Sequence, residues 1–185
     1  IMPSLVGSEM CKETVCVLFA FLYTTGPYPL SYNGWGDVLV IIFFGFVPVG
    51  GTYYVQALTW TPDVTIASFI CGLLIDTLLV VNNYRDREAD ARSGKRTVIV
   101  RFGEKFGRYF YLLLGISASL LCLYFLREGH IYAALLPQLY LVPHVLTWRR
   151  MVKIHSGKKL NSILGETSRN MLLMGILIAI GMLIN

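Results

Sequence analysis

The sequence carries little charge for its length. Of its 185 residues only 15% are charged, while 55% are hydrophobic and the mean hydropathy is +0.60. Soluble domains usually carry about a quarter charged residues. The shortage of charge therefore indicates a membrane protein, and the length fits one domain.

Cysteine and histidine are too scattered to form a framework. No two of the cysteines Cys11, Cys16, Cys71 and Cys122 have metal-ligand spacing, and the three histidines lie far from them in sequence. A disulfide scaffold or a zinc site is therefore not expected. We expect small thiols that fill gaps between helices.

The chain also lacks the start of a secretory protein. Residues 1–10, IMPSLVGSEM, have no basic start and no small-residue cleavage site, and the first residue is Ile1 rather than methionine. We expect that the natural protein begins upstream of Ile1.

Long apolar runs are abundant. A bilayer-spanning helix needs about 20 mostly apolar residues, and six segments are candidates: 8–24, 36–56, 63–84, 106–126, 131–148 and 168–184. The expected fold class is therefore all-α, a multi-pass transmembrane helix bundle with six spans. Within the second span, GFVPVGG at 45–51 predicts either a bend that lines a cavity or close helix packing.

The cations predict the orientation. Fourteen of the 16 Lys and Arg residues lie in two connections, 85–108 and 149–169. Two helices separate these connections, so both fall on one side, and the positive-inside rule makes that side cytoplasmic. Alternation places the 25–35 connection there too. We expect a protein of the cell inner (cytoplasmic) membrane, surrounded by lipid bilayer and without a nucleic-acid partner.

Polar side chains gather on one face of the segment 75–90, IDTLLVVNNYRDREAD. On a helix of 3.6 residues per turn, Asp76, Asn83, Asp90 and Asp86 fall within about 80° of one another. Asp86 and Asp90 stand at i and i+4, where two carboxylates repel unless a cation lies between them. Oxygen ligands of this kind suit Mg²⁺ together with phosphate oxygens.

Two cations follow this segment. SGKRT supplies Gly94 for a turn and then Lys95 and Arg96, which could hold the oxygens of a diphosphate. Asn83 would add an amide oxygen or orient a ligand water. The competing interpretation is a solvated face of mixed charge at the membrane edge. Asp76, deep in its span, either lines a substrate cavity or is a protonated acid bonded to a neighbouring helix.

Three motifs carry a family resemblance. NNYRDREADARSGKRT (82–97) resembles the second aspartate-rich motif of the UbiA superfamily of intramembrane aromatic prenyltransferases. YTTGPYPLSYNGWGD (23–37) and GFVPVGGTYYVQ (45–56) are similar to the branch that prenylates 1,4-dihydroxy-2-naphthoate in menaquinone biosynthesis. The resemblance covers roughly residues 15–185.

The resemblance implies a bundle of about nine helices with two aspartate-rich motifs that bind Mg²⁺ and a polyprenyl diphosphate. Loss of diphosphate and CO₂ would give demethylmenaquinone. By matched position it implies Asp86 and Asp90 as catalytic metal ligands, with Asn83 in support. It implies diphosphate contacts at Lys95, Arg96 and Tyr23, and Asp76 and Tyr32 would lie at the substrate cavity.

One departure from the family pattern is large. Apart from the match at 82–90, which belongs to the second motif, the pattern of the first aspartate-rich motif, N-x-x-x-D-x-x-x-D, is absent from these 185 residues. We therefore expect residues 1–185 to be the C-terminal part of a single transmembrane prenyltransferase domain, holding half of the metal site.

Two other functions were considered. A CDP-alcohol phosphatidyltransferase would need D-G-x-x-A-R upstream, which the sequence lacks. A transporter or ion-pathway subunit would use Asp76 as a proton site, and its flux would survive Asp86→Asn and Asp90→Asn.

Overall fold

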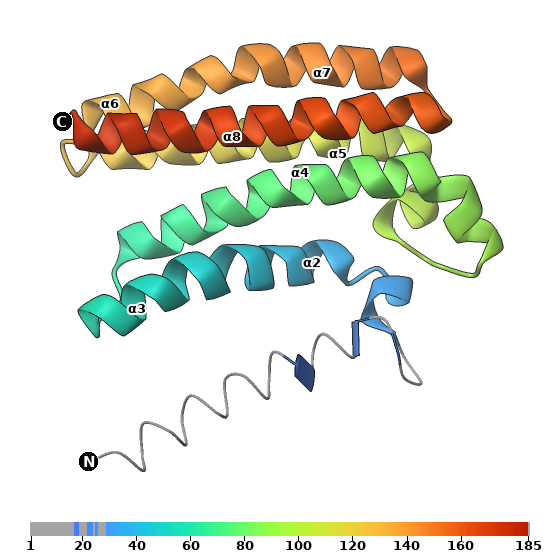
Figure 1. Ribbon diagram of the computed structural model, residues 1–185, viewed down its shortest axis with the longest axis horizontal. Helices are drawn as coiled ribbons and strands as arrows, with labels where there is room; N and C mark the ends of the chain where they lie inside the picture. The colour runs from blue at the N-terminus through green and yellow to red at the C-terminus, as the bar shows by residue number, and fades with distance from the viewer. Residues whose placement is uncertain (1–16, 19–21, 24, 26–28, 185) are drawn as a thin grey trace.

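The structure is a computed structural model that describes residues 17–18, 22–23, 25 and 29–184, and Figure 1 shows a bundle of long helices side by side. Every regular element among these residues is helical, which confirms the all-α fold class. Two runs of elements open the described chain: η1 (Leu30–Asn33), and then α2 (Gly36–Val40), η2 (Ile41–Gly50) and α3 (Gly51–Ala57), which continue as one helix.

The remaining elements form the rest of the bundle. They are α4 (Pro62–Arg92), α5 (Val98–Leu121) with η3 (Cys122–Leu126), then α6 (Ile131–Leu135), η4 (Leu136–Tyr140) and α7 (Leu141–Ile154), and finally η5 (Lys158–Leu160) with α8 (Asn161–Leu183). The core lies among α4, α5, α7 and α8, around the fully buried side chains of Val80, Tyr84, Tyr111, Met151 and Ile163.

Four of the described helices are long and apolar enough to cross a membrane: Gly36–Ala57, Pro62–Arg92, Val98–Leu126 and Lys158–Leu183. The count of six spans is therefore not confirmed. Most of the predicted span 8–24 lies outside the described residues. The predicted span 131–148 is helical, but Gln138 and His144 dilute its apolar character.

Helix α4 extends well beyond its apolar run. Thr61 caps its first turn by accepting a hydrogen bond from the Val64 amide, and Pro62 occupies the first helical position, where no amide donor is needed. The helix ends at Arg92, and Gly94 follows with φ +78. The prediction that 75–90 belongs to one continuous helix is confirmed, since Asp86 and Asp90 both lie on α4.

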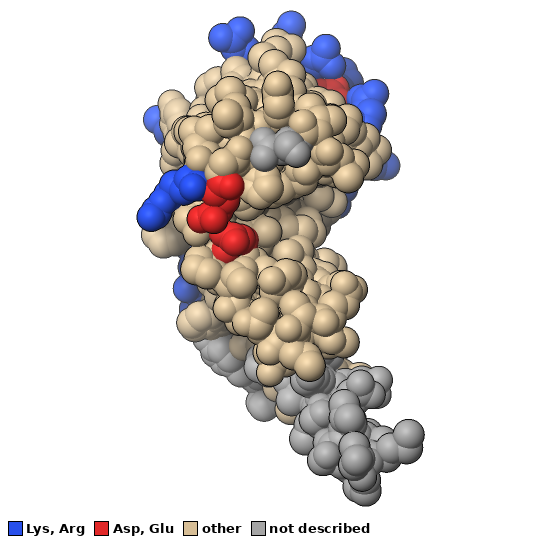
Figure 2. Space-filling view, turned by 90° about the vertical axis from the view of Figure 1, so that its left-hand side faces the viewer, with Lys and Arg blue, Asp and Glu red and all other residues tan. Residues whose placement is uncertain are grey.

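Three connections meet at one end of the bundle, which we call the polar end: 29–35, 93–97 and 155–160 (Figure 1). The Arg96 amide donates to the Tyr32 carbonyl at 2.7 Å, and the Arg85 guanidinium donates to Asn161 Oδ1 at 3.0 Å. The predicted gathering of these connections at one end is therefore confirmed. Figure 2 looks at the opposite end, where a small acidic group with one basic neighbour stands out on a mostly uncharged face.

The first long helix packs closely on α4. A Cβ added at Gly45 would lie 2.4 Å from the Ser68 carbonyl oxygen, and one at Gly72 would lie 2.9 Å from Ile41 Cα. Only glycine allows this approach, so the small-residue packing predicted for 45–51 is confirmed at Gly45. The stretch Ile41–Gly50, which contains Pro48, is a π-helical segment of wider turns.

Candidate functional site

Asp90 and Lys95, two of the predicted site residues, form an ion pair at the polar end. The Lys95 ammonium lies 3.3 Å from Asp90 Oδ1, and it stands over the Tyr32 ring, 5.4 Å from its centroid. The Asp90 side chain is mostly buried, so this charge is shielded from water. Three predicted site residues, Asp90, Lys95 and Tyr32, are thus brought together. Asn83, on the same face of α4, is also buried.

Asp86 points to the edge of this face. Both of its carboxylate oxygens accept from the Arg85 guanidinium, at 2.7 Å and 2.6 Å, and its side chain is 37% exposed. The same guanidinium donates to Asn82 Oδ1 at 2.7 Å. Asp86 also borders a polar pocket of about 830 Å³ that Arg92 and Lys158 share. The predicted carboxylate pair therefore has one buried and one half-exposed member.

The 29–35 connection is fastened to the turn after α4 by its backbone. Gly34 has φ +83, and a Cβ there would lie 2.9 Å from the Arg96 carbonyl oxygen. Both the backbone angle and this close approach therefore require glycine. Arg101 donates to the Asn33 carbonyl at 2.7 Å. The Arg96 side chain itself is exposed. This docking fixes Tyr32 over Lys95.

A buried acidic pair lies next to Tyr23. Asp76 is fully buried, and neither of its oxygens has a hydrogen-bond partner among the described residues. Asp37, in the first turn of α2, is 7% exposed and is the charged group that acts most strongly on Asp76. A Cβ at Gly36 would lie 3.5 Å from the Tyr23 hydroxyl. We call Tyr23, Asp37 and Asp76 the carboxyl pocket.

Asp37 was not singled out from the sequence. An acid in the first turn of a helix is common because the helix dipole favours it there, so GWGD at 34–37 gives no distinctive signal. Only the close packing of α2 on α4 sets Asp37 opposite Asp76.

An apolar cavity of about 850 Å³ lies between the first long helix, α4 and α8. Phe43 and Phe44 line it. Tyr23 and Asn82 are its polar lining residues near the charged end. Asp76 and Tyr32 are not lining residues: Asp76 is buried against the neighbouring helix, and Tyr32 lies at the polar end beneath Lys95.

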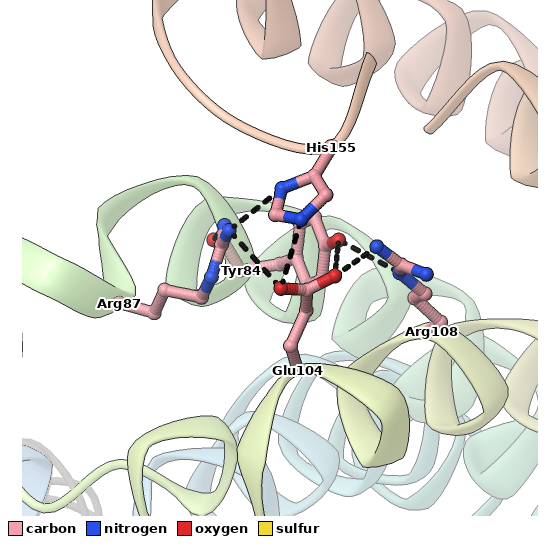
Figure 3. Close-up of polar contacts among 5 residues, drawn as sticks. All are labelled: Tyr84, Arg87, Glu104, Arg108 and His155. Atoms are coloured by element: carbon pink, nitrogen blue, oxygen red, sulfur yellow. Dashed lines mark hydrogen bonds and ion pairs between the residues drawn. The ribbon is translucent and has the colours of Figure 1, made fainter. Parts of the chain in front are cut away.

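A second charged group surrounds Glu104, and Figure 3 shows its five residues pointing at one another. Arg87 and His155 lie 3.5 Å and 3.3 Å from Glu104 Oε2, and Arg108 pairs with Oε1. The Tyr84 hydroxyl donates to Glu104 and accepts from Arg108 Nε at 2.9 Å. We call this group the Glu104 cluster. Arg87 and Arg108, expected mainly to fix topology, therefore also tie α4 to α5.

The oxygen donors of Asp86, Asp90 and Asn83 fit Mg²⁺ chemically, since this ion takes one or two carboxylates and completes its shell with water and phosphate oxygens. They do not make a closed site. No group of three His, Cys, Asp or Glu residues able to hold a metal occurs in the described part of the chain. Each carboxylate is paired with a cation, so a metal would have to displace Arg85 or Lys95.

Comparison with known proteins agrees with the motifs. Residues 14–182 match the UbiA prenyltransferase family. The chain is 34% identical over 173 residues to a 1,4-dihydroxy-2-naphthoate octaprenyltransferase of Haemophilus influenzae, covering 92% of this chain and 56% of that protein. The Escherichia coli protein of the same name is 40% identical over 107 residues, which cover 58% of this chain and 34% of that protein.

A more distant relative is a UbiA prenyltransferase domain-containing protein of Dictyostelium discoideum, 29% identical over 88% of this chain and 48% of that protein. The chain spans about half the length of the relatives that it matches over most of its own length. No solved structure matches. Nothing in these comparisons supports a transporter. The chain belongs to the UbiA prenyltransferase family.

Proposed function

We propose that the full-length protein transfers a polyprenyl group from polyprenyl diphosphate to 1,4-dihydroxy-2-naphthoate. Diphosphate and CO₂ leave, and the product is the quinol (reduced) form of demethylmenaquinone. The protein would work in the cell inner membrane with its polar end in the cytoplasm. The names of the relatives that cover most of the chain support the two substrates, and the cation distribution supports the orientation.

One observation carries the proposal: an apolar cavity reaches the charged end of the bundle. Asn82 lines the cavity and also accepts from Arg85, which holds Asp86. Tyr23 lines it too and lies within the electrostatic influence of Lys95. A substrate with a long apolar tail and a diphosphate head needs this combination of an apolar slot and a cationic mouth.

The residues divide the chemistry between them. A Mg²⁺ ion held by Asp86 and Asp90 would act as a Lewis acid on the diphosphate. Lys95 and Arg96 supply fixed positive charge where negative charge develops as the C–O bond breaks. The face of Tyr32 or Tyr23 would stabilise the allylic cation by about 0.5–2 kcal/mol. Phe43 and Phe44 keep water from the tail and the cation.

The direct test is an assay of membranes that carry the full-length protein. With both substrates and Mg²⁺ we expect a prenylated naphthoquinol, identified by its mass, and we expect EDTA to abolish it until Mg²⁺ is restored. Asp86→Ala should also abolish product. Glu88→Gln is the matched control, because Glu88 is exposed on the same turn of α4 and should leave product formation unchanged.

Two results would contradict the proposal. Absence of product from well-expressed wild-type protein would exclude this pair of substrates. Product that resists both EDTA and Asp86→Ala would exclude the metal role of this carboxylate.

A further inference from the structure

The carboxyl of Asp76 is unusual for a membrane helix. It is fully buried on α4, and neither oxygen has a hydrogen-bond partner in the described part of the chain. A carboxyl in a membrane span is costly to insert, and a buried acceptor without a donor lowers the stability of the fold. A side chain kept only for packing would avoid both costs.

Asp37 repeats the feature from the facing helix. Among the residues that the structure describes, its Oδ1 is likewise buried without a hydrogen-bond partner. Two carboxylates that face each other away from water cannot both be ionised, because like charges repel strongly there. The pair is therefore most stable with a single proton, leaving one carboxylate to accept another.

The surroundings connect this pair to the reaction. Tyr23 comes from the preceding segment, and of the charged groups that act on it Asp37 is the strongest, followed by Lys95 and Asp76. The charged and titratable groups that surround the pair are thus the two aspartates themselves, Tyr23 and, beside Tyr23, Lys95. Tyr23 lines the apolar cavity. Its backbone carbonyl accepts from the Ser31 hydroxyl at 2.6 Å, which fixes its position.

We propose that Asp37 and Asp76 share one proton and form the proton store of the prenyl transfer, reached through the Tyr23 hydroxyl. This inference rests on the proposed function. Tyr23 would touch the aromatic acceptor, and the two aspartates would act through it as positioning and proton-holding residues.

The aspartate pair takes up one proton from the acceptor during the reaction and gives it back at the end. Tyr23 takes the proton of an acceptor hydroxyl while passing its own to the free carboxylate. The activated ring carbon then bonds to the allylic carbon as the C–O bond to diphosphate breaks. When CO₂ leaves, its bonding electrons restore the aromatic ring, and the oxygen recovers its proton through Tyr23. The pair ends with the one proton with which it began, so no further reactant is needed.

The test uses Asp37→Asn and Asp76→Asn in the full-length protein, because an amide keeps the size of the side chain and cannot store the proton. We expect each to lower kcat about 100-fold, within the range of general acid–base catalysis, with KM for the prenyl diphosphate unchanged. The double variant should be about as slow as either single one, since the residues act as a unit. Wild-type kcat should fall at acid pH as the pair takes a second proton, and the variants should lose this dependence.

Asp63→Asn, on the opposite end of α4, is the matched control and should behave as wild type in kcat and pH profile. If wild type makes no product, the proposed function fails. If wild type is active and both Asn variants keep its kcat and pH profile, the proton store fails alone. If the aspartate variants do not accumulate in the membrane, Tyr23→Phe decides: a loss of kcat with KM unchanged supports the store, and wild-type kcat overturns it.

Discussion

The Glu104 cluster and the carboxyl pocket surround their acids in opposite ways, and Glu104 is only partly buried whereas Asp76 is fully buried. Glu104 is surrounded by Arg87, Arg108, His155 and the Tyr84 hydroxyl. Asp76 has no hydrogen-bond partner among the described residues and faces a second acid. A compensated charge holds helices together, whereas an uncompensated one costs stability and is kept where chemistry needs it. The contrast separates residues that serve the fold from those that serve the reaction.

The largest effect on prenyl transfer is expected at the polar end, where Asp90 both pairs with Lys95 and is a proposed metal ligand. Asp90→Asn removes a proposed metal ligand and the ion-pair partner of Lys95. Loss of an outer-shell metal contact typically lowers activity by about 10- to 100-fold, so loss of a direct ligand should lower prenyl transfer by at least about 100-fold. The measurement is product formed per amount of folded full-length protein. Activity equal to that of Glu88→Gln would remove Asp90 from the site.

A change in the Glu104 cluster should lower the stability of the fold rather than the rate of prenyl transfer. Glu104→Gln leaves Arg87 and Arg108 without their carboxylate, and Arg87 is only 11% exposed. Loss of hydrogen bonds between charged groups predicts a fall in the free energy of unfolding of about 1.5–3 kcal/mol. Equilibrium unfolding in detergent measures this fall. An unchanged unfolding midpoint together with lost prenyl transfer would reverse the assignment of this cluster.

The contrast also depends on how closely the first long helix (Gly36–Ala57) approaches α4. Gly45→Ala places a Cβ 2.4 Å from the Ser68 carbonyl oxygen, so the helices must separate, at a cost of about 1–3 kcal/mol in unfolding free energy. Because this also moves Asp37 from Asp76, prenyl transfer should fall. Gly51→Ala, with nothing within 4 Å of the added Cβ, is the control. Equal stability of the two variants would refute the close approach.

The smallest effect on stability is expected at Asp76. Asp76→Leu removes a buried carboxyl whose proposed bond is the proton shared with Asp37, and Asp37 can keep that proton, so the unfolding free energy should stay within about 1 kcal/mol of wild type or rise. The same unfolding experiment tests it. A loss as large as that of Glu104→Gln would show that Asp76 has a stabilising partner.

The parts of this fold that depend on local pattern could be predicted. The span 36–56 agrees with the helix Gly36–Ala57, and the charged end of α4 was expected to remain helical. The predicted span 106–126 lies within the helix Val98–Leu126, whose start is interrupted at Gly103 (φ +85) and carries charged residues that a hydropathy scan counts against it.

The parts that depend on packing could not be predicted. Asp86 and Asp90 were recognised by their spacing and by the motif, and Lys95 by the turn that follows. That Lys95 pairs with Asp90 while Arg85 takes Asp86 depends on side-chain geometry. Asp37 and Glu104 were missed because their partners lie on other helices. Glu104 also stands among cations that the positive-inside rule already explains.

The central claim is that the facing acids Asp37 and Asp76 serve prenyl transfer and that Glu104, paired with its cations, serves the fold. The most direct measurement is prenyl transfer to dihydroxynaphthoate per folded full-length molecule, for Asp76→Asn and Glu104→Gln side by side. The account predicts a folded but nearly inactive Asp76→Asn and a less stable Glu104→Gln that retains most of its activity per folded molecule. An active Asp76→Asn beside an inactive Glu104→Gln would contradict it.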